Sequence, residues 1–198
     1  MSAVIPLDAS APRTPDVARW VDPILFGRGM AVIRIFFGII LFANGLAKLD
    51  AGLGRIDLGP YHANLVTRDG ARSILNFEVN ERPVGRDGPR GTQVPGLRPF
   101  VNDVVLANWG VFQWVVVAIE VVGGGLLILG LATRGAALVA LGQQLFLALV
   151  YLSSNRWAFE QPHEYVPLIV LALVPAGRAW GLDGLLVRDR PDLRRWPF

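Results

Sequence analysis

Long apolar runs alternate with polar segments along the chain. Three runs are long enough for a membrane-spanning helix, which needs about 20 predominantly apolar residues, and they cover residues 29–48, 109–131 and 136–152. A fourth apolar stretch is short and reaches a spanning length only when its proline-containing flanks are included, over residues 159–180. The pattern therefore predicts four transmembrane helices.

The order of these runs predicts the fold class and its parts. We expect an all-α, polytopic membrane protein: a four-helix bundle with a long extracytoplasmic loop, residues 49–108, between the first and second helices. The membrane domain covers residues 29–187. Residues 1–28 lack the apolar core of a signal peptide and predict a cytoplasmic tail with an interfacial segment. Residues 188–198 predict a basic cytoplasmic tail.

The predicted loop has different flanks and middle. Its middle, residues 76–99, is rich in glycine, proline and charge and shows turn signals without sustained periodicity. Residues 63–77 predict a short amphipathic helix, and residues 100–107 predict a segment that runs along the interface into the second span. A structureless loop of this length is uncommon unless it is functional.

Composition supports the membrane interpretation and narrows the chemistry. The chain is 53% hydrophobic and only 18% charged, against about 25% charged in an ordinary soluble domain. It has no cysteine, which excludes thiol catalysis, iron–sulfur clusters and covalent haem attachment through cysteine. We expect no catalytic residue, no metal site and no cofactor held by this chain alone; a quinone or lipid shared with a partner stays open.

The basic residues lie mainly in loops and tails. We interpret them as topology signals rather than as a nucleic-acid surface. Their distribution predicts a bacterial-type inner (plasma) membrane protein whose termini are both cytoplasmic.

Polar residues inside the spans are the candidate site. A charged group at the bilayer centre costs about 2.5–3.5 kcal/mol, so it usually faces the bundle interior and finds a partner. At about 100° per residue, one face of the first span carries a cation, two glycines and a second cation. The second span carries a carboxylate beside three glycines. These residues are Arg34, Gly38, Gly45, Lys48, Glu120, Gly123, Gly124 and Gly125.

We expect the pairs Arg34–Glu120 and Lys48–Glu164. Three interpretations stay open: the pairs only fix helix packing, they line a polar pocket for a headgroup, a quinone or a proton path, or the charges pair with another subunit. We expect Gln143, in the third span, either to form an interhelical hydrogen bond or to line the pocket. We expect His163, beside Glu164, either to be an interfacial side chain or to form part of a proton-handling dyad.

These positions resemble the DoxX family of small four-span membrane proteins. The resemblance covers about residues 28–187 and depends on four short motifs, whose residues are Arg34, Gly45 and Lys48; Glu120, Gly123–Gly125, Leu131, Thr133 and Arg134; Glu164; and Gly177, Gly181, Leu182 and Asp183. It implies a four-helix bundle tied to electron-transfer assemblies. The long loop between the first two spans departs from the family pattern and suggests a surface for a partner.

Three functions follow as hypotheses. The first is an accessory or anchoring subunit of a larger electron-transfer complex, with its other subunits and membrane lipids as partners and no nucleic acid. The second is a quinone-interacting subunit of an enzyme similar to thiosulfate:quinone oxidoreductase, with a charged intramembrane pocket. The third is a homo-oligomeric transporter of small solutes.

Overall fold

The computed structural model describes residues 22–49, 53–85, 88–154, 160–194 and 196–198, and they are mostly helical. Three helical segments are long and apolar enough to cross a membrane: α1 (Pro23–Leu49), the segment Trp109–Leu129, and α6 (Thr133–Tyr151). The second is built from α4 (Trp109–Ala118), a π-helical turn η5 (Ile119–Gly123) and α5 (Gly124–Leu129). The predicted spans over 29–48, 109–131 and 136–152 correspond to these three segments.

The fourth apolar helix is shorter than predicted. α7 (Pro162–Leu173) has 12 residues, about 18 Å at 1.5 Å per residue, whereas the predicted segment covers 159–180. Residue 159 lies outside the described residues. At the other end, α7 stops at Leu173 and the chain continues through η6 (Ala176–Arg178) and α8 (Leu182–Asp189) to η7 (Pro191–Arg194).

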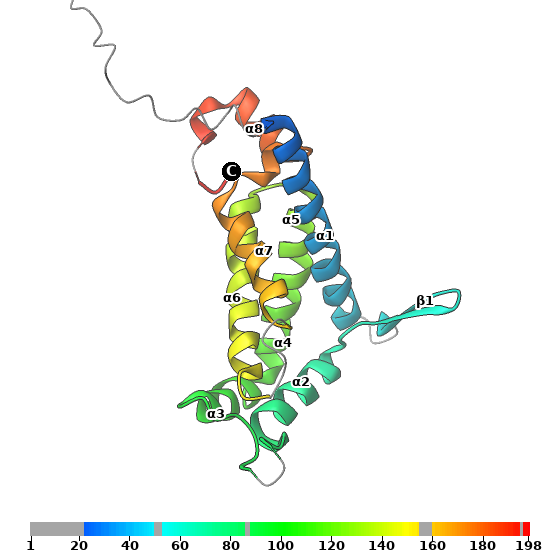
Figure 1. Cartoon of the computed structure of the whole chain (residues 1–198), viewed down its shortest axis with the longest axis vertical. Helices are drawn as coiled ribbons and strands as arrows, with labels where there is room; N and C mark the ends of the chain where they lie inside the picture. The colour runs from blue at the N-terminus through cyan, green and yellow to red at the C-terminus, as the bar shows by residue number, and fades with distance from the viewer. Residues whose placement is uncertain (1–21, 50–52, 86–87, 155–159, 195) are drawn as a thin grey trace, which may run out of the picture.

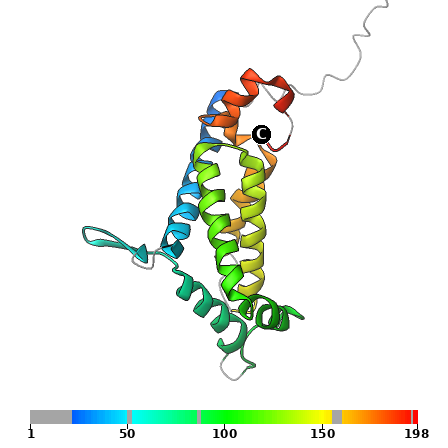
Figure 2. The same cartoon turned by 180° about the vertical axis from the view of Figure 1, so that it is seen from behind.

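The four apolar helical segments lie side by side in an elongated bundle (Figures 1 and 2). The start of α1, α8 and the C-terminus lie at one end of it, which we call the terminal end. The segment that joins α1 to α4 lies at the other end, which we call the insertion end (Figure 1). Residues 130–132 alone join the segment Trp109–Leu129 to α6, and so short a connection places sequence neighbours antiparallel.

Small residues allow the helices to approach closely. A Cβ atom at Gly38 of α1 would lie 2.8 Å from the Ile128 backbone nitrogen, and one at Gly124 would lie 2.6 Å from the Phe42 nitrogen. Helices in membranes pack through such backbone-to-backbone contacts. Gly45 approaches Val121 similarly, whereas a Cβ at Gly123 would meet no atom within 4 Å.

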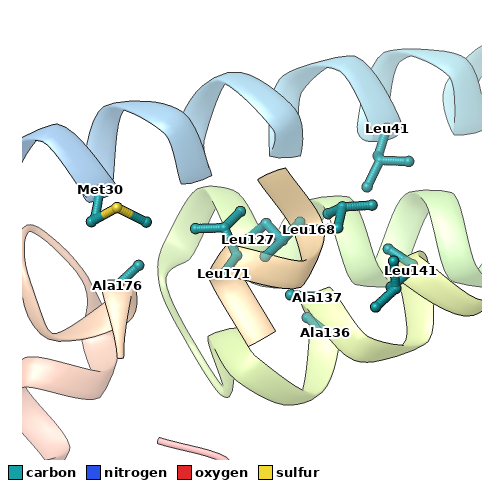
Figure 3. Packing of buried hydrophobic residues seen from close by; sticks show 10 residues of the cluster. Met30, Leu41, Leu127, Ala136, Ala137, Leu141, Leu168, Leu171 and Ala176 are labelled. Carbon is teal, nitrogen blue, oxygen red and sulfur yellow. The ribbon is translucent and has the colours of Figure 1, made fainter. Parts of the chain in front are cut away.

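The larger of the two buried apolar clusters in the described residues lies between the helices and toward the terminal end. Leucines from α1, α5, α6 and α7 surround a row of alanines on α6, as Figure 3 shows for most of the cluster. Its buried members are Met30, Leu41, Leu127, Ala136, Ala137, Ala140, Leu141, Leu168, Leu171 and Ala176.

The insertion between α1 and α4 is structured wherever it is described. β1 (Arg55–Leu58) and β2 (Tyr61–Asn64) form an antiparallel hairpin that projects from the bundle (Figures 1 and 2). Gly59 has φ +64°, the left-handed conformation that a two-residue hairpin turn requires. The predicted helix over 63–77 is α2 (Arg68–Asn76), which the Thr67 hydroxyl caps by accepting a hydrogen bond from Gly70 N at 3.2 Å.

The rest of the insertion packs against the bundle. It contains η3 (Phe77–Glu81), α3 (Leu97–Pro99) and η4 (Phe100–Leu106). The described residues between η3 and α3 form turns and bends with one isolated bridge, Pro83–Arg90, in keeping with the turn signals of the sequence. Glu78 is buried and accepts hydrogen bonds from Arg82 at 2.7 Å and from the Ser154 hydroxyl at 2.5 Å. The hydrogen bond to Glu78 raises the pKa of Arg82. The contact with Ser154 fixes the insertion to the end of α6.

Candidate functional site

A buried ion pair lies inside the bundle. The Lys48 ammonium of α1 is 2.7 Å from Glu120 Oε2, and the two side chains are only 5% and 8% exposed. Gln143 of α6 donates a hydrogen bond from Nε2 to Glu120 Oε1 at 3.0 Å. Three segments far apart in sequence thus meet at one carboxylate. Glu120 lies in the π turn η5, an irregularity that is frequent at functional sites.

The predicted Arg34–Glu120 pair is wrong. Arg34 lies level with Leu127 and Ile128 at the end of α5, and donates hydrogen bonds to their carbonyl oxygens at 2.9 and 3.4 Å. Glu120 lies seven residues earlier, about 10 Å further along the helix axis. Lys48 was expected to pair with Glu164, but the structure gives it Glu120 as carboxylate partner.

Arg34 instead stabilises the terminal end. Its guanidinium also donates to the Trp180 carbonyl at 3.0 Å, so a fully buried cation satisfies carbonyl groups at a helix C-terminus, where positive charge is favourable. Asp183 is equally buried and accepts hydrogen bonds from the backbone of Ala132 and Thr133 at 2.7 and 3.1 Å. It therefore caps the start of α6 from another helix.

The ion pair lies at the wall of a cavity of about 580 Å³, a size typical of ligand sites. α1, α2, η4, α4, η5, α6 and α7 all contribute to its lining. Most lining residues are aliphatic or aromatic, among them Phe36, Phe37, Ile40, Leu41, Phe100, Trp109, Phe112, Phe146, Leu147 and Leu168.

One side of this cavity faces the surface of the bundle. Phe36 and Ile40 line the cavity and are 58% and 41% exposed. Both belong to an apolar spanning helix, whose exposed side chains contact lipid when the helix lies in a membrane. The cavity is therefore placed to receive a molecule from the lipid phase.

Two hydrogen-bond acceptors at the cavity have no partner within the part of the chain that the structure describes. They are Oε1 of Gln143 and Oε1 of Gln144, both buried and both in cavity-lining residues. The Gln143 amide is held in this orientation because Glu120 Oε1 accepts from its N–H group, whereas an amide oxygen has no hydrogen to donate. An unpartnered buried acceptor costs about 1–3 kcal/mol. The site is thus ready for a ligand that donates hydrogen bonds.

His163 and Glu164 also line the cavity, from the first turn of α7. The structure thus brings Lys48, Glu120, Gln143, His163 and Glu164 to one cavity and places Arg34 elsewhere. Among the described residues, no group of three or more histidine, aspartate or glutamate side chains could hold a metal ion.

A second, smaller pocket adjoins the ion pair. It has a volume of about 250 Å³ and is lined by Ala47, Lys48, Thr67, Arg68, Asp69 and Gln113, so the two pockets share Lys48. Arg68 is held over the ring of Trp114, at 5.0 Å from its centroid. Sequence reasoning missed this pocket, because the amphipathic pattern of residues 63–77 predicts α2 but not where it docks.

No family model matches the chain, and searches of the curated proteins and of the solved structures found no similar protein.

Proposed function

We propose that this protein is an accessory subunit of a membrane electron-transfer complex and that it binds a quinol in the intramembrane cavity. The observation that carries the proposal is the pair of unpartnered amide oxygens, on Gln143 and Gln144, at the wall of an otherwise largely apolar cavity. A quinol has hydroxyl groups that donate hydrogen bonds and an apolar ring and tail. It therefore matches both parts of the cavity.

The lateral position of the cavity supports a lipid-soluble ligand. Phe36 and Ile40 border it from the lipid-facing side of α1, so an isoprenoid tail can remain among the acyl chains while the ring enters. An ion pair that only fixed helix packing would not require a cavity of this size beside it. This favours the pocket over the purely structural interpretation.

The chain's own chemistry supports an accessory role. It has no cysteine and only two histidines, so we propose that a redox cofactor in a partner subunit exchanges electrons with the quinol. Its α2 and η4 segments help to line the cavity from the insertion end. The projecting β1–β2 hairpin offers a contact surface for such a partner.

We also propose the topology and the family. In this proposal α7 is the fourth passage, and the terminal end lies in the cytoplasm of a bacterial-type inner membrane. The motif residues that resemble the DoxX family include Arg34, Thr133, Gly177, Gly181 and Asp183. A Cβ at Gly177 would overlap Thr133 Oγ1, and Arg34 donates a hydrogen bond to the carbonyl of Trp180, just before Gly181. Their meeting at one end supports the family as a proposal.

The test is ligand binding to the purified protein in lipid nanodiscs. A short-chain ubiquinol and its oxidised ubiquinone are titrated while tryptophan fluorescence is followed, since Trp109 lines the cavity. We expect saturable binding and a higher affinity for the quinol, because the quinone has no hydroxyl to donate. Gln144→Leu should weaken quinol binding by roughly 5- to 150-fold, from about 1–3 kcal/mol for one lost hydrogen-bond partner.

The matched control is Leu145→Ala, a lipid-facing position of the same helix that is 43% exposed. This variant should bind the quinol as the unsubstituted protein does. The proposal fails if no saturable binding is seen, or if Gln144→Leu and Leu145→Ala bind the quinol equally well.

A further inference from the structure

Lys48 stands between two pockets of opposite character. On one side is the largely apolar cavity, and on the other is the small pocket whose polar lining is Thr67, Arg68, Asp69 and Gln113. This small pocket lies where α2 meets the outer part of α1 and α4. It has room for several water molecules, each of which occupies about 30 Å³ in the liquid.

We infer that the small pocket is a water and proton route from the insertion side to the Lys48–Glu120 pair. An ammonium group has three N–H donors. Lys48 donates two hydrogen bonds, to Glu120 Oε2 at 2.7 Å and to the Asn44 carbonyl at 3.4 Å. Within the described residues its third hydrogen has no protein acceptor, and it is available to water in the pocket.

Charged and polar groups line both pockets on either side of the pair. Asp69 and Arg68 of α2 border the small pocket, Lys48 of α1 and Glu120 of η5 follow, and Glu164 and His163 of α7 line the cavity beyond them. α4 contributes Gln113 to the pocket, and α6 contributes Gln143 to the carboxylate. Trp114 holds the Arg68 guanidinium by a cation–π contact.

This route deepens the proposed function. When a quinol in the cavity is oxidised to the quinone, both hydroxyl O–H bonds break, two electrons in total pass to the redox cofactor of the partner subunit, and two protons are released. Each proton passes to Glu120, and Lys48 gives an ammonium proton to water in the small pocket and takes one from Glu120 in return. Water access to the pair exists without a quinol, so it can be tested separately.

The absence of cysteine makes single-cysteine labelling a direct test. Gln113→Cys and Ala47→Cys place a thiol in the small pocket, and Val122→Cys places one on the lipid-facing side of the same spanning segment, where Val122 is 59% exposed. Tyr61 of the hairpin is 76% exposed, so labelling of Tyr61→Cys identifies the compartment on the insertion side. Each variant is reconstituted in vesicles and treated with a charged, membrane-impermeant methanethiosulfonate.

Only the thiolate reacts, and a charged group deep in lipid is disfavoured by roughly 100-fold. We therefore expect Gln113→Cys and Ala47→Cys to react roughly 100-fold faster than Val122→Cys. The labelling rates of Gln113→Cys and Ala47→Cys should also rise with the pH of the compartment from which Tyr61→Cys is labelled. The reason is that their thiols exchange protons with water that enters the small pocket from this compartment.

Two results would overturn the inference. One is labelling of Gln113→Cys and Ala47→Cys no faster than that of Val122→Cys. The other is a rate that follows the pH of the opposite compartment. Neither result involves a quinol, so failure here leaves the proposed ligand untouched, and failure of quinol binding leaves the water route untouched. Ala47→Cys, a small change, serves if Gln113→Cys does not fold.

Discussion

Replacing Lys48 by methionine should destabilise the protein far more than removing the whole ion pair. The Lys48 and Glu120 side chains are 2.7 Å apart and are 5% and 8% exposed. Removing one partner leaves a buried charge uncompensated, which costs about 3–5 kcal/mol. Replacing both by apolar residues of similar volume removes the desolvation cost together with the attraction, and is often neutral or stabilising.

A double-mutant cycle measures this difference. The variants are Lys48→Met, Glu120→Leu and the double variant, and the free energy of unfolding is measured by equilibrium denaturation in mixed micelles, followed by circular dichroism. We expect each single variant to lose about 3–5 kcal/mol and the double variant to lose at most about 1 kcal/mol. Additive losses, with the double variant losing the sum of the two, would refute the buried pair.

Three further substitutions test the helix packing by the same measurement. Gly38→Ala should destabilise the bundle by more than about 1 kcal/mol, because the new Cβ would lie 2.8 Å from the Ile128 backbone nitrogen. Gly29→Ala, whose Cβ would meet no atom within 4 Å, should be neutral or stabilising. Equal effects of the two substitutions would contradict the close contact between α1 and α5. Gly130→Ala should cost at least about 2 kcal/mol, because residue 130 has φ +66° and a Cβ there would overlap the Arg34 guanidinium; a neutral result would contradict the Arg34 cap. Ala132→Gly should stabilise by up to about 1 kcal/mol, because Ala132 has φ +46°; a loss would show that this conformation is not strained.

Hydropathy predicts the three long helices well because a helix that crosses a membrane must be predominantly apolar along its whole length. The three long runs correspond to helices that are apolar enough to cross a membrane. The fourth stretch contains Pro162, Pro167 and Pro175, and α7 begins at the first of these and stops before the last. Helix length near prolines depends on local backbone hydrogen bonding, which average hydropathy does not measure.

Helix periodicity predicts which face a polar residue occupies but not its depth. Lys48 and Arg34 share a face of α1 but lie at different depths in the bundle. Lys48 meets Glu120 in the middle of the second segment, and Arg34 meets the end of α5. Relative depth depends on how the glycine contacts fit together, and these form only in the folded bundle.

The β1–β2 hairpin could have been predicted from a shorter signal. Gly59 and Pro60 separate two four-residue strands, and glycine at the first position of such a turn is typical of a hairpin. The position of α2 at the cavity could not have been predicted, because it depends on tertiary contacts with α1 and, through η3, with α6.

The most direct test of the account is a crystal structure of the protein with a bromine-substituted hydroquinone, because the anomalous signal of bromine locates the ring independently of the lipid. We predict an anomalous peak inside the cavity, with a ring hydroxyl within hydrogen-bonding distance of the Gln143 or Gln144 amide oxygen. A cavity that contains no bromine while the lipid-facing surface does would contradict the account.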